Sequence, residues 1–209
     1  MKKYLAVPVA LAAAGFMAPA ASAAITAHAQ VAVRAQARNA VAARPAGQRT
    51  VARFACQGQG PLTGYVVFGT SWRVSSTLLT AGHAAFACGY RFNAPFDYSL
   101  FNYPGSLGLN TQRLERTYVG EHVRMVGMPG TGMSVYVSYG TVAALHQTVN
   151  VQWPFGYVDS EYDQVVIRGT SYPGMSGGPV LAPDGAVVGL VDWGTSNGVY
   201  SGGSPAYDL

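Results

Sequence analysis

Residues 51–209 are dominated by short runs of β-branched and aromatic residues, each bounded by Gly, Pro, Asn or Ser. Runs of this kind are typical of β-strands, whereas the 3.6-residue spacing of an amphipathic helix is hard to find here. The clearest hairpin signal is a pair of apolar runs, Val180-Leu181 and Ala186-Val187-Val188, separated by Ala-Pro-Asp-Gly. The sequence therefore predicts an all-β fold, because many short antiparallel strands close into barrels or sandwiches.

Residues 1–23 have the layout of a secretory signal peptide. Lys2 and Lys3 precede an apolar run from Leu5 to about Phe16, and a small-x-small cleavage site follows at residues 21–23. The mature chain is then expected to begin near Ala24. The apolar run is shorter than the ~18–20 residues of a membrane-spanning helix, and no later stretch is that long and uncharged. We expect no stable membrane anchor after cleavage; the alternative is a signal that stays uncleaved as an anchor.

Residues 24–50 differ in composition from the rest of the chain. They are rich in Ala, Val and Arg, contain one Pro, and lack Asp and Glu. We interpret them as a pro-segment or flexible linker, with a short amphipathic helix as the lesser alternative. In residues 51–209, seven Arg against nine Asp and Glu leave a net charge of −2, so the whole-chain charge of +4 is no sign of nucleic-acid binding.

Residues 51–209 match the size of one domain, or of two small subdomains that share an interface. This part contains both cysteines of the chain, Cys56 and Cys88. In an exported chain, two cysteines favour one structural disulfide, with a pair of free thiols as the alternative. Because no Cys-x-x-Cys and no metal-ligand spacing is evident, we expect no redox role, no metal and no cofactor.

Two motifs contain candidate catalytic residues. The first is the run Leu79-Thr80-Ala81-Gly82-His83, which would place His83 at the end of a strand. The second is Gly174-Met175-Ser176-Gly177-Gly178, in which glycines let the backbone turn tightly around the serine. Such a turn can aim the N–H groups of Gly174 and Ser176 at the charge that develops on a substrate carbonyl oxygen. The plainer alternatives are a structural histidine and an idle serine in a surface turn.

The spacing Gly174-x-Ser176-x-Gly178 also fits the nucleophile elbow of α/β-hydrolases. That motif requires a strand before the serine, a helix after it and a histidine further along the chain. Here Gly-Pro follows the serine motif at once, and no His lies downstream of Ser176. The sequence therefore argues against an α/β-hydrolase.

The strand ending in Thr-Ala-Gly-His83, the later Gly-x-Ser176-Gly-Gly-Pro-Val and the following Val-Asp-Trp-Gly resemble the trypsin-like (chymotrypsin-fold) serine peptidases of the bacterial secreted or periplasmic type. The resemblance covers residues 60–200. It implies two packed antiparallel β-barrels, about 51–118 and 119–209, with the active site in the cleft between them. It also implies that Ser176 is the nucleophile, His83 the general base, and Gly174 and Ser176 the oxyanion hole.

The same resemblance implies an acid that orients His83, and Phe96-Asp97-Tyr98 is the matching segment. Asp97 would hold the imidazole in the tautomer that accepts the serine proton. Only 14 positions separate it from His83, fewer than in relatives, which implies a trimmed hairpin. Asp192 is the main competitor, because relatives often carry a serine close to the acid at this position, and Asp163 comes third.

The resemblance also assigns substrate contacts. Thr170, six positions before Ser176, would form the base of the specificity pocket, and its neutral side chain favours a small or medium uncharged substrate residue. Val191, Trp193 and Gly194 would bind the substrate backbone as an added strand, with the glycines at 202 and 203 as further walls. For Trp193 a place in the core is the alternative.

Met175 marks a departure from the digestive members of the family, which carry an Asp directly before the nucleophile. That Asp pairs with a newly cut N-terminus, and Met175 offers no carboxylate for such a pair. We therefore do not expect activation through this ion pair. A pro-segment would have to act by another route, such as blocking the cleft or aiding folding.

We expect a secreted or periplasmic serine endopeptidase that acts on protein or peptide substrates and has no nucleic-acid partner. One alternative is a non-catalytic trypsin-like domain that binds a protein partner through its cleft, and a weaker one is an esterase on the same fold. The joint presence of Ser176, His83 and Gly174 favours an enzyme, because a binding domain has no need of all three. The oligomeric state is not indicated.

Overall fold

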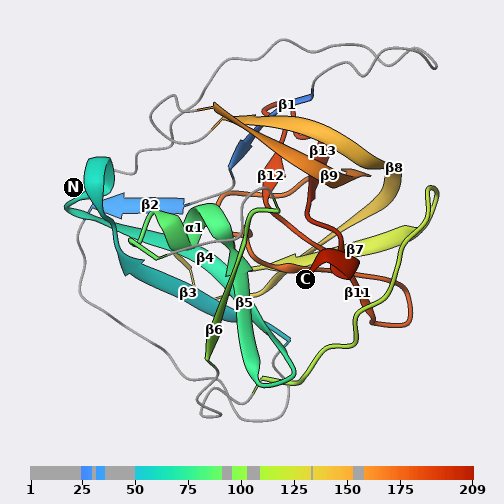
Figure 1. The fold of residues 1–209 in the computed structure, drawn as a ribbon, viewed down its shortest axis with the longest axis horizontal. Helices are drawn as coiled ribbons and strands as arrows, with labels where there is room; N and C mark the ends of the chain where they lie inside the picture. Colours follow the sequence, from blue (N-terminus) through green and yellow to red (C-terminus); the bar gives the residue numbers. More distant parts are fainter. Residues whose placement is uncertain are drawn as a thin grey trace.

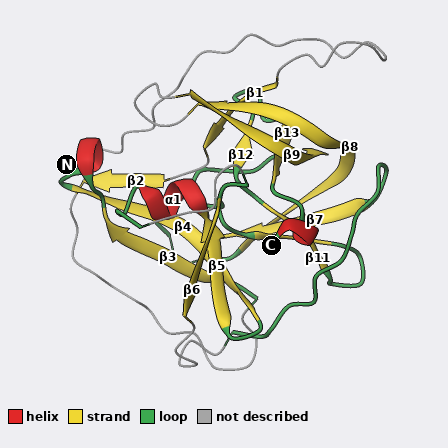
Figure 2. Ribbon diagram, in the orientation of Figure 1, coloured by secondary structure: helices red, strands yellow, loops and turns green. Residues whose placement is uncertain are grey.

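The computed structural model describes residues 25–29, 32–35, 50–90, 96–102, 109–132, 134–152 and 158–209. Strands dominate this part of the chain (Figure 2), so the prediction of an all-β fold is confirmed. The helical elements are short: η1 (Gly60–Leu62), α1 (Gly82–Phe86) and η2 (Ala206–Asp208). Within the described residues, no helix has the length and apolar character needed to cross a membrane. The predicted signal peptide lies outside them.

A five-stranded antiparallel sheet forms the first half of the fold. The sheet runs in the order β2-β4-β5-β6, and β3 also pairs with β4. Its strands are β2 (Ala32–Ala35), β3 (Ala52–Gln57), β4 (Tyr65–Val74), β5 (Thr77–Ala81) and β6 (Tyr98–Asn102). Because β4 and β5 form a hairpin and β6 returns along β5, the end of β5 lies next to the start of β6.

An eight-stranded sheet forms the second half, in the order β1-β12-β13-β9-β8-β7-β10-β11. All its pairings are antiparallel except that of β1 with β8. Its strands are β1 (Ile25–Ala29), β7 (His122–Gly127), β8 (Tyr136–Gln152), β9 (Val158–Arg168), β10 (Pro179–Leu181), β11 (Val187–Leu190), β12 (Trp193–Gly194) and β13 (Tyr200–Gly203). The predicted hairpin around residue 184 is formed by β10 and β11.

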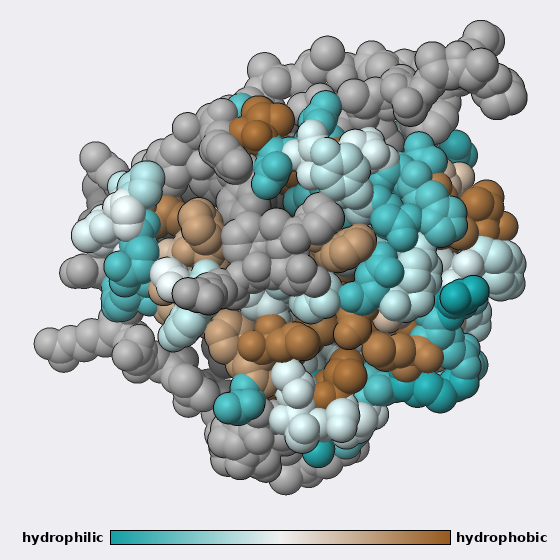
Figure 3. All heavy atoms as spheres, viewed as in Figure 1, coloured by the Kyte–Doolittle hydropathy of each residue, from teal (hydrophilic) through white to brown (hydrophobic). Residues whose placement is uncertain are grey.

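One apolar cluster joins the two sheets. Trp72 and Leu79 of the first sheet pack with Val126, Val187 and Leu190 of the second, and all five side chains are buried. A separate cluster around Met125 and Ile167 fills the second half. On the face seen in Figure 3, hydrophobic residues gather in a band across the lower centre, with hydrophilic residues on the right. The shared cluster fixes the two sheets against each other, and the candidate catalytic residues lie where they meet.

Within residues 24–50, which we interpret from their composition as a pro-segment or flexible linker, the structure describes two strands, β1 and β2. The amphipathic helix considered as an alternative is absent from the described part of this segment. A strand added to an existing sheet is held by backbone hydrogen bonds and needs no apolar composition of its own. Residues 25–29 and 32–35 are therefore held by the strands with which they pair.

Candidate active site

His83 and Asp97 are brought together by the pairing of two strands. β5 ends at Ala81 and runs directly into α1, which contains His83. β6 pairs with β5 so that Tyr98 lies opposite Ala81, and the N–H of Gly82 donates to the carbonyl of Asp97 over 2.6 Å. The short separation along the chain is sufficient because Asp97 needs only to reach the first residue of β6.

Both oxygens of the Asp97 carboxylate are bonded to His83. The backbone N–H of His83 donates to Oδ1 over 2.6 Å, and ring nitrogen Nδ1 is bonded to Oδ2. The two side chains are only 1% and 2% exposed. A carboxylate bound to Nδ1 favours the tautomer with the proton on that nitrogen, which leaves the ring's acceptor lone pair on Nε2.

Ser176 lies in the loop between β9 and β10, at the seam of the two sheets. Its carbonyl accepts the N–H of Thr70 in β4 over 2.7 Å, and the next N–H, of Gly177, donates to the carbonyl of Val191 over 2.7 Å. Gly177 has a φ of 86°, and a Cβ there would lie 2.1 Å from the carbonyl oxygen of Thr70. Only glycine fits this position, because any side chain would collide with β4.

Thr70 connects the first sheet to the serine loop through its side chain as well. Its hydroxyl donates to the carbonyl of Gly174 over 2.8 Å and accepts the N–H of Met128 over 3.0 Å. The side chain is completely buried. Sequence analysis does not identify Thr70, because its only signal is a hydroxyl within an otherwise largely apolar run.

The hydroxyl of Ser176 donates to the carbonyl oxygen of Asp192 over 3.2 Å. Within the described part of the chain, the N–H groups of Gly174 and Ser176 have no hydrogen-bond acceptor. Gly174 has a φ of 96°, and a Cβ there would lie 2.9 Å from backbone atoms of Met128 and Gly130. Two N–H groups held in this way can bind a negatively charged oxygen.

Asp192 places a second acid beside the His83–Asp97 pair. A ring nitrogen of His83 and one carboxyl oxygen each of Asp97 and Asp192 lie within 4.8 Å of one another. Oδ2 of Asp192 accepts the N–H of Ser204 over 2.9 Å, while Oδ1 is buried without a hydrogen-bond partner among the described residues. Burial, and then the nearby charge of Asp97, raise the pKa of Asp192 well above its usual range. This shift favours the protonated form of Asp192.

The same three residues are spaced closely enough to be considered as metal ligands. Nδ1 of His83 and Oδ2 of Asp97 are, however, bonded to each other, and Oδ1 of Asp97 accepts a backbone N–H. Nδ1 of His83 and both carboxylate oxygens of Asp97 are thus already bonded within the cluster. We interpret the group as a hydrogen-bonded acid–base cluster.

Glu161 of β9 is a third buried acid that sequence analysis does not single out. It is 3% exposed, and both carboxylate oxygens lack a hydrogen-bond partner within the described residues. Burial is the main cause that raises its pKa well above the usual range, followed by the charges of Asp97 and Asp192. A single Glu in a strand of mixed polarity looks like a solvent-facing residue, so the sequence carries no signal of its burial.

Asp163, the third candidate for the orienting acid, is engaged elsewhere. Its carboxylate is bonded to the ring of His146 and accepts the hydroxyl of Tyr207 over 3.1 Å. The His146 side chain is 67% exposed, which places this group at the surface. Of the three candidate acids, it is Asp97 whose carboxylate is bonded to the His83 ring.

Comparison with known proteins identifies the family. A sequence profile of the trypsin-like peptidase domain matches residues 29–190. The chain belongs to this family. The resemblance seen in the sequence is thereby confirmed, and the chain is a serine-type endopeptidase. No curated protein matches it in sequence.

Solved structures share the fold of this peptidase. The Rv3671c protease from M. tuberculosis in its active form has a TM-score of 0.61 and 19% identity, with 76% of each chain covered. The HtrA-type protease AlgW with a tripeptide has a TM-score of 0.57 and 17% identity, with 77% of this chain and 58% of that chain covered. These similarities confirm the trypsin-like all-β fold.

The predicted substrate-binding residues of the peptidase lie on β12 and next to it. Val191, Trp193 and Gly194 are buried. The Trp193 ring packs against Val149, Val151 and Val166, and its indole N–H donates to Oε1 of Gln164 over 3.0 Å. The side chain of Trp193 is therefore part of the core, and its backbone alone is placed to pair with another strand.

The other predicted pocket positions are also engaged within the chain. Thr170 is half-buried, and its hydroxyl donates to the carbonyl of Gly198 over 2.6 Å. A Cβ on Gly202 would lie 2.5 Å from the Trp193 ring, and one on Gly203 would lie 2.6 Å from Oδ2 of Asp192. These two glycines thus make room for Trp193 and Asp192.

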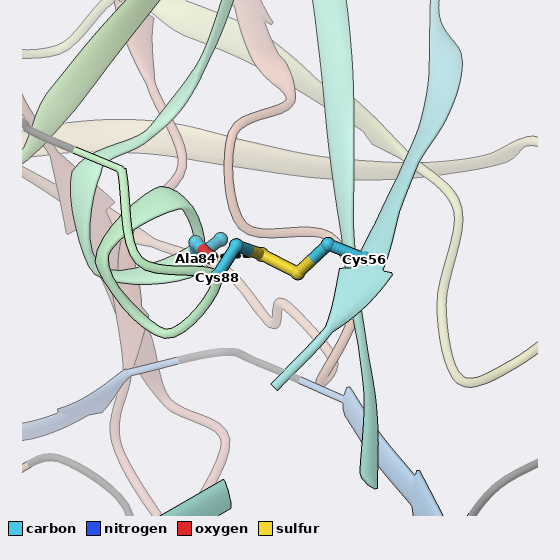
Figure 4. The surroundings of a disulfide bond; sticks show 3 residues. All are labelled: Cys56, Ala84 and Cys88. Carbon is cyan, nitrogen blue, oxygen red and sulfur yellow. Dashed lines mark hydrogen bonds between the residues drawn. A yellow bond between two sulfur atoms is a disulfide. The ribbon is translucent and has the colours of Figure 1, made fainter. Parts of the chain in front are cut away.

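Cys56 of β3 and Cys88, two residues after α1, are joined in a disulfide (Figure 4). The Cα atoms lie 5.8 Å apart, and the sulfur of Cys88 is 3.0 Å from the carbonyl oxygen of Ala84 in α1. The disulfide therefore ties the helix of His83 to the first sheet.

Proposed function

We propose that this peptidase hydrolyses peptide bonds through an acyl-enzyme, with Ser176 as nucleophile, His83 as general base and Asp97 as orienting acid. The observation that carries the proposal is the pair of buried hydrogen bonds between Asp97 and His83, one to the imidazole ring and one to the backbone N–H. A ring held at Nδ1 presents Nε2 as the base. The Asp97 interaction is also what distinguishes a catalytic domain from a binding domain that has lost its acid.

In the first half of the reaction, Nε2 of His83 removes the proton from Ser176 as Oγ attacks the substrate carbonyl. The imidazolium then gives this proton to the leaving amine, and Asp97 stabilises its positive charge. In the second half, water attacks the acyl-enzyme with His83 again as the base. Rotation of the Ser176 hydroxyl away from the Asp192 carbonyl must come first, because that carbonyl holds its proton in the resting structure.

The developing oxyanion would be bound by the N–H groups of Gly174 and Ser176. The positive φ of Gly174 and the hydrogen bond from Thr70 to its carbonyl support this role, because together they orient the peptide groups of the loop. Removing one oxyanion donor typically costs about 10²–10³ in kcat. Because the Thr70 hydroxyl is bonded to the carbonyl of Gly174, removing that hydroxyl should lower kcat.

Export and processing form the second part of the proposal. Residues 1–23 would be removed as a signal peptide, giving a secreted or periplasmic enzyme, and residues 24–50 would act as a pro-segment ahead of a peptidase unit at 51–209. Met175 is completely buried in the apolar cluster of the second sheet, with a side-chain atom 2.8 Å from a Cβ built on Gly127. This packing supports activation without a buried ion pair at that position.

The test is labelling of the folded, oxidised protein with a fluorophosphonate after long incubation at neutral pH, with the adduct located by mass spectrometry. We expect a single adduct on Ser176, none in Ser176→Ala and a strongly reduced rate in His83→Ala. Assays on peptide and ester substrates separate a peptidase from an esterase. Folded protein without an adduct would contradict the proposal and favour the binding domain.

A further inference from the structure

Asp97 has an unusual backbone conformation for a residue with a side chain. Its φ is 45°, in the left-handed region that residues other than glycine seldom adopt. Aspartate tolerates this region better than most residues, but such a conformation persists only where its surroundings hold it. The direction of the Cα–Cβ bond depends on the two peptide groups that flank the residue. Whatever holds these two groups therefore also aims the carboxylate at His83.

The peptide group after Asp97 is held by the first sheet. The carbonyl of Asp97 accepts the N–H of Gly82 over 2.6 Å. The next residue, Tyr98, begins β6 and lies opposite Ala81 of β5. This side of Asp97 is therefore fixed by the same strand pairing that brings it to His83.

The peptide group before Asp97 is held by the second half of the fold. Ser204, which directly follows β13, donates its hydroxyl proton to the carbonyl of Phe96. A peptide group is planar, so a hydrogen bond to the Phe96 carbonyl also orients the N–H of Asp97. The φ of Asp97 is thus set between one anchor on each half of the fold.

Ser204 is a firm anchor because its own backbone is held on both sides. Its N–H donates to Oδ2 of Asp192 over 2.9 Å, and its carbonyl accepts the N–H of Leu190 over 2.9 Å. The residue is completely buried. A Cβ on the preceding Gly203 would lie 2.6 Å from Oδ2 of Asp192, so glycine lets this carboxyl group approach the chain. The hydroxyl of Ser204 therefore leaves a backbone of fixed position.

Asp192 connects this anchor to the nucleophile. Its carboxyl group holds the backbone of Ser204, and its own carbonyl accepts the hydroxyl of Ser176 over 3.2 Å. β12 and β13 are antiparallel neighbours (Figure 1), with Trp193 opposite Gly202, so Asp192 and Ser204 lie at the same end of this pair. One end of a strand pair in the second half thus supports both the nucleophile and the orienting acid.

We propose that Ser204 is a positioning residue of the peptidase: its hydroxyl, anchored by Asp192, keeps the Asp97 carboxylate aimed at His83. This inference rests on the proposed function, in which Asp97 orients His83 as the base. Without the hydroxyl, the peptide group before Asp97 loses its anchor. The φ of Asp97 then relaxes toward the negative values that are favoured for residues with side chains, and the carboxylate turns away from the ring.

The experiment measures kcat and KM on an ester substrate for Ser204→Ala, alone and combined with Asp97→Asn. Alone, Ser204→Ala should lower kcat by about 10- to 100-fold with KM changed much less, because a misplacement of about 1 Å can have effects of this size. Combined with Asp97→Asn, it should change kcat by less than about twofold, because the interaction that it supports is already lost. An unchanged kcat in Ser204→Ala, or losses that multiply in the double variant, would overturn the inference.

Ser201→Ala is the matched control. Ser201 is also completely buried, lies on β13 and donates its hydroxyl proton to the carbonyl of Gly169 over 2.8 Å. This variant loses the same kind of hydrogen bond but leaves the Phe96 peptide group untouched. Melting curves of both variants check that they are folded. If Ser201→Ala lowers kcat as much as Ser204→Ala does, the effect is a general loosening of the fold and the inference is wrong.

A measurement without substrate separates this inference from the proposed function. A proton shared between Nδ1 of His83 and the Asp97 carboxylate gives a low-field ¹H NMR resonance, which reports their contact. Ser204→Ala should shift or broaden this resonance, and Ser201→Ala should leave it in place. If folded Ser204→Ala keeps both the resonance and the wild-type kcat, the inference fails while the proposed function stands. If the wild type shows the resonance but hydrolyses no substrate, the proposed function fails, and the resonance of Ser204→Ala still decides the inference.

Discussion

The carboxyl group of Asp192 lies beside that of Asp97, and the two acids have different hydrogen-bond partners. Asp97 is bonded to His83 through both oxygens, whereas Asp192 is bonded to the N–H of Ser204. Burial, and then the charge of Asp97, raise the pKa of Asp192, which favours its protonated form. A raised pKa on one of two neighbouring carboxyl groups lessens the repulsion between them in a buried site.

This relationship predicts different results for two matched substitutions. Asp97→Asn would leave the geometry intact but favour the wrong tautomer of His83, and we expect a loss in kcat on the order of 10⁴-fold, as for the corresponding change in a serine triad. Asp192→Asn changes a side chain that is bonded to Ser204 instead of His83, and it should retain most of the activity. The check is kcat on an ester substrate for both variants. The reverse ranking would assign the orienting role to Asp192.

Thr70 should stabilise both the fold and the serine loop. Thr70→Val keeps the shape but removes the hydroxyl from Gly174 and Met128, and leaving buried partners unsatisfied typically costs about 1–3 kcal/mol. We expect a lower free energy of unfolding in urea and a lower kcat, with KM changed less. Thr70→Ser keeps the hydroxyl and serves as the control. Equal activity in Thr70→Val and wild type would show that the hydroxyl does not position the loop.

The buried carboxyl group of Glu161 should make the stability of the fold depend on pH. Its pKa is raised in the folded state above the ordinary value of 4.5, so the folded chain binds this proton more tightly than the unfolded chain. The contribution is fully present below about pH 4.5 and is lost as the pH rises toward the folded-state pKa. Glu161→Gln should therefore flatten the decline of Tm on the alkaline side. Glu115→Gln, at an exposed ion pair with Arg113, is the control and should leave that slope unchanged.

The disulfide should stabilise the part of the fold that carries His83. Its cysteines are separated by 32 positions, and closing a loop of that length stabilises a protein by about 3–4 kcal/mol in the chain-entropy description. We expect Cys56→Ala with Cys88→Ala to lower the urea midpoint accordingly. The loss of activity on warming should come at a lower temperature, because α1 loses its link to β3. Unfolding curves of wild type and variant, with activity measured at each temperature, provide the test.

Local sequence was sufficient for the parts of this protein that depend on neighbouring residues. The glycines around Ser176, the small residues before His83 and the strand pattern predict the serine turn and the all-β class, because turn geometry and strand propensity act over a few residues. The β10–β11 hairpin is of the same kind. These features can be predicted from the sequence without knowledge of any tertiary contact.

Contacts between distant segments decided the rest. Which of Asp97, Asp192 and Asp163 lies next to His83 depends on the pairing of β6 with β5. The raised pKa of Glu161 depends on a burial that the sequence of its own strand does not indicate. Thr70 matters through partners more than fifty positions away. Residues 25–29 and 32–35 form strands because β12, β8 and β4 supply their hydrogen-bond partners. Sequence determined the local conformations and the reactive groups, while tertiary structure decided which of them meet, because burial and long-range pairing are properties of the assembled chain.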